Sequence, residues 1–210
     1  MQSLVEGKEQ LMTKARFIAL EGVDGSGTTT QLAQVSQALE KRGLVVPQTM
    51  EPSKGPIGVR IREILRGELV TPPDSLALLF AADRLDHLKR EIEPALERGE
   101  VVLTDRYLIS SHAYQSLAVE LPFIESINAR ARKPDLSILL QLSPEAAAQR
   151  RAKRGEAEEI FDDLELQRTI SDAYDTAFQR KDLGPTAIVD ATGDIEQVTS
   201  DLLKAIDSAA

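Results

Sequence analysis

Residues 17–29 read FIALEGVDGSGTT, and this short stretch decides the fold. Its first four residues are apolar, as in a buried strand, and the run ends at Gly22. Apolar residues then recur at helical spacing between Gln31 and Arg42, so a helix follows the strand closely. A strand that leads through a glycine-rich turn into a helix predicts the first unit of an α/β sheet.

The rest of the chain continues this alternation of strand-like and helix-like segments. Short apolar runs predict a further strand that begins at residues 44–46, and strands at 101–104, 136–140 and 186–189. Helical periodicity predicts helices at 74–98, with a kink or break at Pro94, and at 144–154, 162–180 and 195–206. Because the strands at 101–104 and 136–140 are apolar on both faces, we expect a parallel sheet covered by helices on both sides. We expect one α/β domain over residues 16–210, with residues 1–15 as an N-terminal extension.

The composition excludes several classes of protein. The 210 residues carry 34 acidic and 25 basic side chains, a formal net charge of −9, whereas proteins that bind polynucleotides usually carry a basic excess. No apolar run approaches the roughly 18 residues that cross a bilayer, so no membrane partner is expected. The chain has no cysteine, which excludes disulfides, thiol catalysis and cysteine-ligated metals and permits a cytoplasmic location.

The glycine-rich turn has the spacing of a phosphate-binding loop. Gly22, four further residues, Gly27 and then a hydroxyl residue at Thr29 follow the P-loop pattern. Glycines let successive backbone N–H groups face an anion, and the N-terminus of the following helix adds partial positive charge. Thr29 would hold Mg²⁺. An ordinary strand-to-helix turn is the alternative, but the spacing and the flanking elements favour a phosphate site.

Thr28 stands where the P-loop pattern requires lysine. That lysine brings a positive charge to the transferred phosphate, whereas threonine offers a neutral hydrogen bond. Loss of one preorganised charged donor typically costs about 3–4 kcal/mol of transition-state stabilisation. Either another cation substitutes, or the protein is slow, or it no longer transfers phosphate.

Two further clusters of charge accompany the loop. Asp105 and Arg106 follow the strand at 101–104, where a carboxylate can organise Mg²⁺ and a guanidinium can grip a phosphate; a strand-end ion pair is the alternative. Residues 150–154, RRAKR, place four cations in five residues. A solvated helix end would account for them, but they also suit a mobile lid that closes over a nucleotide.

These three elements, in this order, resemble the thymidylate kinase family of nucleoside monophosphate kinases from about Arg16 to the C-terminus. EGVDG at 21–25 is similar to the family's loop entry, and FAADR at 80–84 resembles its nucleotide-contacting helix. The most specific likeness is DRY at 105–107, followed by Ser110, Ala113, Tyr114 and Gln115. The resemblance implies a three-layer P-loop kinase fold, a parallel sheet flanked by helices, with a short lid at about residues 150–162.

The resemblance also implies a role for each matching residue. Asp24 would contact the deoxyribose 3′-hydroxyl, Phe80 would stack on thymine unless it only packs in the core, and Tyr114 would crowd the 2′ position. Arg84 and Arg106 would hold the acceptor phosphate, and Ser111 and Gln115 would hydrogen-bond the base edge. The full implied set comprises ATP-binding residues Gly22, Asp24, Gly25, Ser26, Gly27, Thr28, Thr29 and Thr30, the Mg²⁺-organising pair Thr29 and Asp105, and catalytic residues Asp24, Arg106, Arg150 and Arg154.

Several positions depart from the family's pattern. Besides Thr28 in the loop, Ile160 stands where many members carry a lid arginine, so two cations near the transferred group are absent. Met50 replaces an arginine before Glu-Pro, and Lys54 close by could restore a cation there. The best candidates to compensate for Thr28 are Arg150, Arg151 and Arg154 of the lid, with Lys14 a weaker one.

The implied activity is transfer of the γ-phosphoryl group of ATP to dTMP, which forms dTDP and ADP for dTTP synthesis. The resemblance further implies a cytoplasmic homodimer whose partners are small nucleotides and Mg²⁺. Two alternatives stay open: a degenerate nucleotide-binding protein with weak or no kinase activity, and a kinase for another deoxynucleoside monophosphate.

Overall fold

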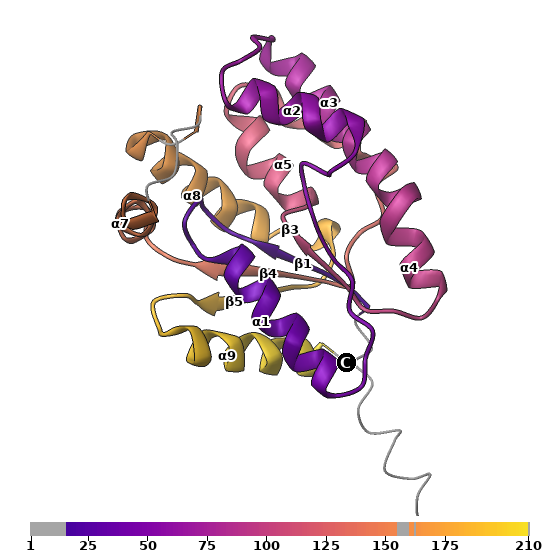
Figure 1. The fold of residues 1–210 in the computed structure, drawn as a ribbon. Coiled ribbons are helices and arrows are strands. Elements are labelled where there is room, and N and C mark those ends of the chain that lie inside the picture. The colour runs from indigo at the N-terminus through magenta and orange to yellow at the C-terminus, as the bar shows by residue number, and fades with distance from the viewer. Residues whose placement is uncertain (1–15, 155–159, 162, 210) are drawn as a thin grey trace, which may run out of the picture.

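The computed structural model describes residues 16–154, 160–161 and 163–209. Within these residues a parallel sheet has the strand order β2-β3-β1-β4-β5 (Figure 1). The predicted α/β class is therefore confirmed. The strands are β1 (Phe17–Glu21), β2 (Gln48–Met50), β3 (Val102–Asp105), β4 (Leu136–Gln141) and β5 (Thr186–Asp190).

The centre of the sheet is as apolar as the sequence predicts. All five residues of β1 are buried between β3 and β4, and all four of β3 are buried as well. Leu20 of β1 is paired in register with Asp105 of β3. The carboxyl ends of these two strands therefore meet at the edge of the sheet where the loop of 22–27 begins.

Helices cover both faces and give the expected three layers. α1 (Thr28–Lys41) and α9 (Ile195–Ser208) pack together on one face, and α5 (Leu108–Tyr114) and α8 (Leu164–Phe178) pack together on the other (Figure 1). The remaining helical elements are α2 (Pro56–Leu65), α3 (Pro73–His87), η2 (Leu88–Ile92), α4 (Glu93–Glu97), η3 (Gln115–Leu117), α6 (Leu121–Asn128), α7 (Pro144–Arg154) and η4 (Lys181–Leu183).

The long helix predicted over residues 74–98 is broken, but the break comes before Pro94. α3 ends at His87, η2 is a π-helical segment over Leu88–Ile92, and Pro94 lies at the start of α4. Proline has no N–H to donate to the carbonyl four residues earlier, so the irregular turn falls just upstream of it.

The second strand begins later than predicted. β2 spans Gln48–Met50, whereas the prediction had this strand begin at residues 44–46. Val46 is buried and Leu44 packs against the core, which explains the apolar signal. Residues 44–46 still run beside the sheet, because the Val45 carbonyl accepts a hydrogen bond of 2.9 Å from the Val101 N–H. β2 itself is an edge strand with partly exposed side chains, so it lacks a continuous apolar run.

Two expectations fall on parts of the chain that the structure does not describe. These are the N-terminal extension, residues 1–15, and the middle of the lid, residues 155–159 and 162. Among the described helices, none has the length and apolarity needed to cross a membrane.

Candidate active site at the phosphate loop

Three glycines with positive φ shape the loop between β1 and α1. Gly22 has φ +157°, Gly25 has φ +93° and Gly27 has φ +100°. Gly27 precedes the first residue of α1, and no side chain caps this helix end. The first N–H groups of α1 are therefore available to an anion, as the P-loop pattern predicts.

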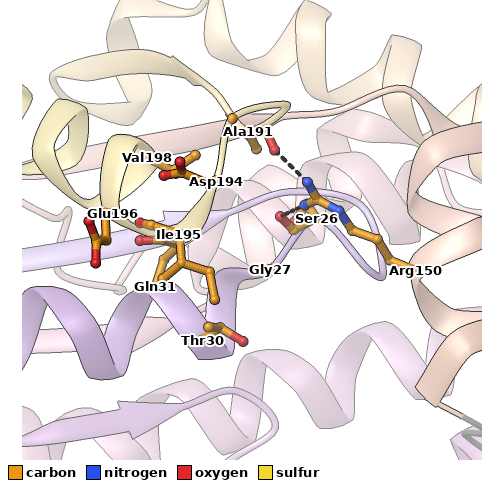
Figure 2. Close-up of a pocket in the computed structure, with 11 residues that line it drawn as sticks. Ser26, Gly27, Thr30, Gln31, Arg150, Ala191, Asp194, Ile195, Glu196 and Val198 are labelled. Atoms are coloured by element: carbon orange, nitrogen blue, oxygen red, sulfur yellow. Dashed lines mark hydrogen bonds between the residues drawn. The ribbon is translucent and has the colours of Figure 1, made fainter.

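A cavity of about 710 Å³, here called the α9 cavity, opens between this helix end and the start of α9 (Figure 2). Its lining includes the predicted residues Ser26, Gly27, Thr30 and Arg150. The Ser26 hydroxyl is buried and has no hydrogen-bond partner among the described residues. No sequence motif marked the opposite wall, which is formed by Ala191, Gly193, Asp194, Ile195, Glu196 and Val198, with Gln31 beside it.

Arg150 bridges the two walls of the α9 cavity (Figure 2). Its guanidinium donates to the Ser26 carbonyl at 3.2 Å and to the Ala191 carbonyl at 2.8 Å. Asp194 and Glu196 place carboxylates at the far end. The cavity is therefore cationic near the phosphate loop and acidic near α9, which suits phosphates at the first end and a base and sugar at the second.

A second cavity, of about 130 Å³, lies beside Asp24 and is here called the α5 cavity. The structure brings all seven residues expected to bind the acceptor to this one cavity, although they come from distant parts of the chain. The seven are Asp24, Phe80, Arg84, Arg106, Ser111, Tyr114 and Gln115, and Glu51, Pro52, Leu65, Tyr107, Ser110 and Phe161 complete the lining.

Asp24 is the centre of a polar network at the mouth of the α5 cavity. One carboxylate oxygen accepts from Arg106 Nη2 at 2.6 Å. The other accepts from the Tyr114 hydroxyl and from Gln167 Nε2, both at 3.1 Å. Burial raises the pKa of Tyr114 well above its ordinary value, so its hydroxyl keeps the proton that it donates.

Arg106 is held in place by its backbone as well as by its partners. Its φ of +67° is in the left-handed region that favours glycine, which is typical of residues fixed by function. Its guanidinium also donates to the Gly22 carbonyl at 2.7 Å and to the Tyr174 hydroxyl at 2.8 Å. Burial works to lower the Arg106 pKa, but Tyr114, Tyr174, Asp24 and Asp105 outweigh it and raise the pKa, so the group stays charged.

Glu21, at the end of β1, is a site residue to which the sequence gave no role of its own. Its side chain is fully buried and accepts hydrogen bonds from the Tyr107 N–H, the Ser110 hydroxyl and the Tyr174 hydroxyl. Burial raises the pKa of this carboxyl, and the Ser110 bond and nearby Arg106 lower it only in part. Glu21 thus organises the residues that surround Arg106.

Arg84 differs from its expected role. It is 1% exposed, and its guanidinium uses all five donors within the protein. Two go to Glu51 at 2.7 and 3.0 Å, and the others go to Ser111, Asn128 and the Tyr107 carbonyl. Arg84 therefore lines the α5 cavity but has no donor left for an acceptor phosphate.

The two residues expected to organise Mg²⁺ lie in direct contact. The Thr29 hydroxyl donates to Asp105 Oδ2 at 2.5 Å, at the point where α1 begins and β3 ends. A hydroxyl and a carboxylate beside a phosphate loop form the oxygen donor set that Mg²⁺ takes together with phosphates, so these residues fit the ion.

Among the described residues, Gly22, Gly25, Thr28 and Ile160 do not line either cavity. Thr28 is 8% exposed at the start of α1. Gly22 and Gly25 belong to the loop, but neither lines a cavity. Arg154 is the last residue of α7, and its side chain lies outside the described part of the structure. Ile160, where the family carries a lid arginine, is 46% exposed and is attached by a backbone hydrogen bond to Leu65.

Gln167 of α8 is a further site residue that the sequence did not indicate. It is fully buried, and its amide nitrogen donates to Asp24 and, at 2.7 Å, to the carbonyl of Phe161. Phe161 in turn packs edge-on against Tyr114, with ring centroids 5.2 Å apart. No motif surrounds Gln167 in the chain, so only the fold could reveal it.

A phosphate loop after the central strand of a parallel sheet, with one cavity on each side of it, defines the class of P-loop phosphotransferases. Comparison with known proteins gives the family. The family model for thymidylate kinase matches residues 20–202. A probable thymidylate kinase from Pyrobaculum calidifontis is 43% identical over 92% of this chain and 96% of its own. One from Pyrococcus abyssi is 40% identical over 89% and 93%, and a thymidylate kinase from Alkalilimnicola ehrlichii is 40% identical over 72% and 73%.

The chain belongs to the thymidylate kinase family. Its activity is accordingly that of a kinase, the ATP-dependent phosphorylation of dTMP to dTDP. The family match does not favour the two alternatives left open by the sequence, a degenerate binding protein and a kinase for another acceptor.

Proposed function

We propose that the enzyme binds ATP in the α9 cavity and dTMP in the α5 cavity and transfers the γ-phosphoryl group across the phosphate loop between them. The observation that carries this proposal is the convergence of seven expected acceptor residues on the α5 cavity, while Ser26 and Gly27 line the α9 cavity. The bond from the γ-phosphorus to the β–γ bridging oxygen breaks, and ADP leaves with its electron pair. A dTMP phosphate oxygen forms the new bond, which gives dTDP.

On the donor side, backbone N–H groups at the start of α1 would receive the ATP phosphates. Thr29 and Asp105 would hold Mg²⁺, which supplies positive charge to the transferred group when bound. Arg150 would contact the nucleotide from the wall between Ser26 and Ala191. The catalytic contribution of Arg154 stays a prediction from the family resemblance.

On the acceptor side, the polar atoms suit a pyrimidine base. The side-chain oxygen of Gln115, Oε1, is buried and has no hydrogen-bond partner within the described part of the chain, so it can accept from the N–H of a thymine edge. Phe80 lines the same cavity and would stack on the base. Asp24 would bind the 3′-hydroxyl of the sugar, with Tyr114 at the 2′ position.

Arg106 and Arg84 have different proposed roles. Arg106 stays charged and lies between Asp24 and the Gly22 carbonyl, so it would bind the acceptor phosphate. Arg84 holds Ser111 with a hydrogen bond of 3.0 Å and is neutralised by Glu51. We therefore assign Arg84 to positioning Ser111 at the base end of the cavity.

The function is tested by ADP release from ATP in the presence of each deoxynucleoside monophosphate and of UMP, together with calorimetric binding of dTMP. We expect the highest kcat/KM with dTMP and weak turnover with UMP, which has a 2′-hydroxyl and no 5-methyl group. Absence of dTMP binding at millimolar concentration would refute the substrate assignment. Equal turnover with all acceptors would refute the proposed roles of Tyr114, Ser111 and Gln115.

We also propose that the protein is a homodimer of the cytoplasm. The apolar stretch at residues 76–88 is largely core, since Leu76, Ala77 and Ala81 are buried. Leu78 on α3 and Leu121 and Phe123 on α6 are instead 48%, 39% and 37% exposed, on helices that pack against each other. These three residues are here called the α3–α6 surface.

A further inference from the structure

A chain of hydrogen bonds leads from the base end of the α5 cavity toward the surface of the protein. Arg84 donates to the Ser111 hydroxyl at 3.0 Å and to Glu51 Oε2 at 2.7 and 3.0 Å. The other oxygen of the same carboxylate, Glu51 Oε1, lies 3.2 Å from Nδ1 of His87. The two oxygens of Glu51 therefore hold Arg84 on one side and His87 on the other.

His87 continues this chain toward solvent. It is the last residue of α3, and its side chain is completely buried. Its second ring nitrogen, Nε2, lies 2.6 Å from the Thr49 hydroxyl of β2, and this hydroxyl donates to Glu91 Oε2 at 2.9 Å. Glu91 belongs to η2 and its side chain is 46% exposed, so the chain ends at the surface.

The number of protons in this chain determines the state of the His87 ring. A carboxylate accepts hydrogen bonds but does not donate them, and a hydroxyl has one proton to give. The Thr49 proton is used on Glu91, so Thr49 accepts its second hydrogen bond from the His87 Nε2–H. Because Glu51 also only accepts, His87 must donate from Nδ1 as well. All three hydrogen bonds form together only when both ring nitrogens carry a proton.

A neutral His87 ring cannot complete the chain. With its one proton on Nδ1, the ring keeps its hydrogen bond to Glu51, but the Thr49 proton then turns to Nε2. The Thr49 and Glu91 oxygens are left 2.9 Å apart with no proton between them. Loss of one proton from His87 therefore removes one hydrogen bond and one of two positive charges that face Glu51.

Charged side chains face His87 from the elements that it contacts. Glu51 follows β2, and Glu91 of η2 has an oxygen 3.7 Å from Nε2, so two carboxylates face the ring. Arg84, about one turn earlier on α3, is the opposing cation and is itself paired with Glu51 at 2.7 Å. The other charged side chains of residues 83–90 are paired elsewhere: Asp83 with Ser53, Asp86 with Arg90, and Lys89 with Glu93.

We propose that His87 is a positioning residue for the acceptor site and that it acts on Ser111 through Glu51 and Arg84 in its doubly protonated form. This inference rests on the proposed function, in which Ser111 binds the base edge of dTMP in the α5 cavity. When His87 loses a proton, Arg84 must neutralise Glu51 without the help of His87 and is drawn away from Ser111. The affinity for dTMP then falls as the pH rises through the titration of His87.

The first experiment is calorimetric binding of dTMP between pH 5.5 and 9 to native protein, His87→Gln and His112→Gln. The dTMP phosphate has its own second pKa of about 6, so each variant is compared with native protein at the same pH. Native protein should bind dTMP about tenfold more tightly than His87→Gln at pH 5.5 and about equally at pH 9, because glutamine donates hydrogen bonds but carries no charge.

His112→Gln is the matched control. His112 is also buried, but burial lowers its pKa to about 4, so its ring is neutral throughout this pH range. The ratio of its dTMP affinity to that of native protein should therefore stay constant with pH.

The second experiment observes the His87 ring in ligand-free native protein by nitrogen-15 NMR. The chain has two histidines, so the His87 signals are those that remain in His112→Gln. Both ring nitrogens of His87 should be protonated at pH 5.5. The Arg84 Nε–H signal, assigned by its loss in Arg84→Lys, should shift with the same midpoint as the His87 signals.

Two results overturn the proposal. One is a His87 ring that is neutral throughout this pH range, and the other is a ratio of native to His87→Gln affinity for dTMP that does not change with pH. If native protein binds no dTMP at millimolar concentration, the proposed function fails, and the Arg84 signal then decides the inference. A signal that follows the His87 titration supports the link from His87 to Arg84, and a signal that does not follow it refutes the link.

Discussion

At the scale of single residues, buried polar groups matter as much as the motif residues. Glu21, Ser110 and Tyr174 form a hydrogen-bonded cluster beneath Arg106, with a Ser110–Tyr174 distance of 2.7 Å. Burying a carboxylate is costly unless donors surround it, and here Ser110 and Tyr174 supply two donors and the Tyr107 N–H supplies a third. The protein therefore buries Glu21 beside Arg106, the guanidinium that is proposed to bind a phosphate.

The first prediction concerns the pH dependence of stability. Burial raises the folded-state pKa of Glu21 above its ordinary value of 4.5, so the folded protein holds this proton more tightly than the unfolded chain does. The resulting stabilisation is complete below pH 4.5 and is lost as the pH rises through the folded-state pKa. The free energy of unfolding of native protein should therefore fall, relative to Glu21→Gln, as the pH rises above 4.5. Urea unfolding of both proteins between pH 4 and 8 measures this difference, and a constant difference contradicts the prediction.

The second prediction concerns Gln167. Replacing it with leucine removes the amide donor shared by Asp24 and the Phe161 carbonyl, and we expect dTMP affinity to fall about tenfold and stability by about 1–3 kcal/mol. MgATP affinity should stay within twofold, because Gln167 does not line the α9 cavity. Calorimetric titration with dTMP and with MgATP measures the two affinities. Gln179→Leu, at an exposed position just beyond the end of α8, is the control, and equal effects of the two variants would refute the role of Gln167.

The sequence predicted this site unevenly at the residue scale. Asp24, Arg106 and Tyr114 belong to contiguous motifs, and the structure brings them together as expected. Gln167 lies in an ordinary amphipathic helix and touches Asp24 only through the fold. The partners of Arg84 were equally hidden, because Glu51 and Asn128 are 33 and 44 residues away in the chain.

At the scale of elements, the contact between α7 and the loop is the most informative. Position 25 requires glycine for two reasons. Its φ is +93°, and the Ala147 carbonyl lies where a Cβ atom would be. The same helix turn carries Arg150 and Arg151 to the loop. α7 therefore serves as a platform that holds the loop in shape.

The third prediction concerns Gly25 and separates the effect of backbone strain from the effect of the contact between the loop and α7. Gly25→Ala should destabilise the protein by more than about 3 kcal/mol and reduce kcat strongly, because the new methyl group strains the backbone and pushes α7 away. Gly43→Ala is the control, since Gly43 has φ +86° with nothing within 4 Å of the added Cβ. It should cost only about 1–2 kcal/mol and leave kcat unchanged. Thermal unfolding and the ADP-release assay measure both effects, and similar losses of activity would refute the role given to the α7 contact.

The elements that the sequence predicted are those with an uninterrupted pattern. α7 was predicted over its full observed range, and β4 and β5 to within one residue. α2, α5 and α6 were not predicted, because they pack mainly against neighbouring helices and not as one apolar face on the sheet. In these helices tertiary contacts, and not local periodicity, decide the structure.

At the scale of the whole molecule, the alternation of strands and helices was enough to predict the parallel three-layer fold. The chain as a whole has a formal net charge of −9. Arg106, which follows β3, and Arg150 and Arg151 of α7 meet on one loop. A chain that is acidic overall thus concentrates positive charge where a polyphosphate has to bind.

The fourth prediction concerns assembly. The α3–α6 surface places three large apolar side chains, Leu78, Leu121 and Phe123, on helices already fixed to each other by Ala77 and Ile124. Sedimentation velocity of native protein should give a dimer, and Leu78→Glu should give a folded monomer, because a charge on this face cannot be buried without a partner. Val45→Glu is the matched control, since Val45 is 64% exposed at a distant position and its substitution should leave the dimer intact. A monomeric native protein, or a Leu78→Glu variant that still dimerises, would show that this surface is not the interface. The α5 cavity contains residues of α3, so the monomer should also bind dTMP more weakly if the dimer contact holds α3 in place.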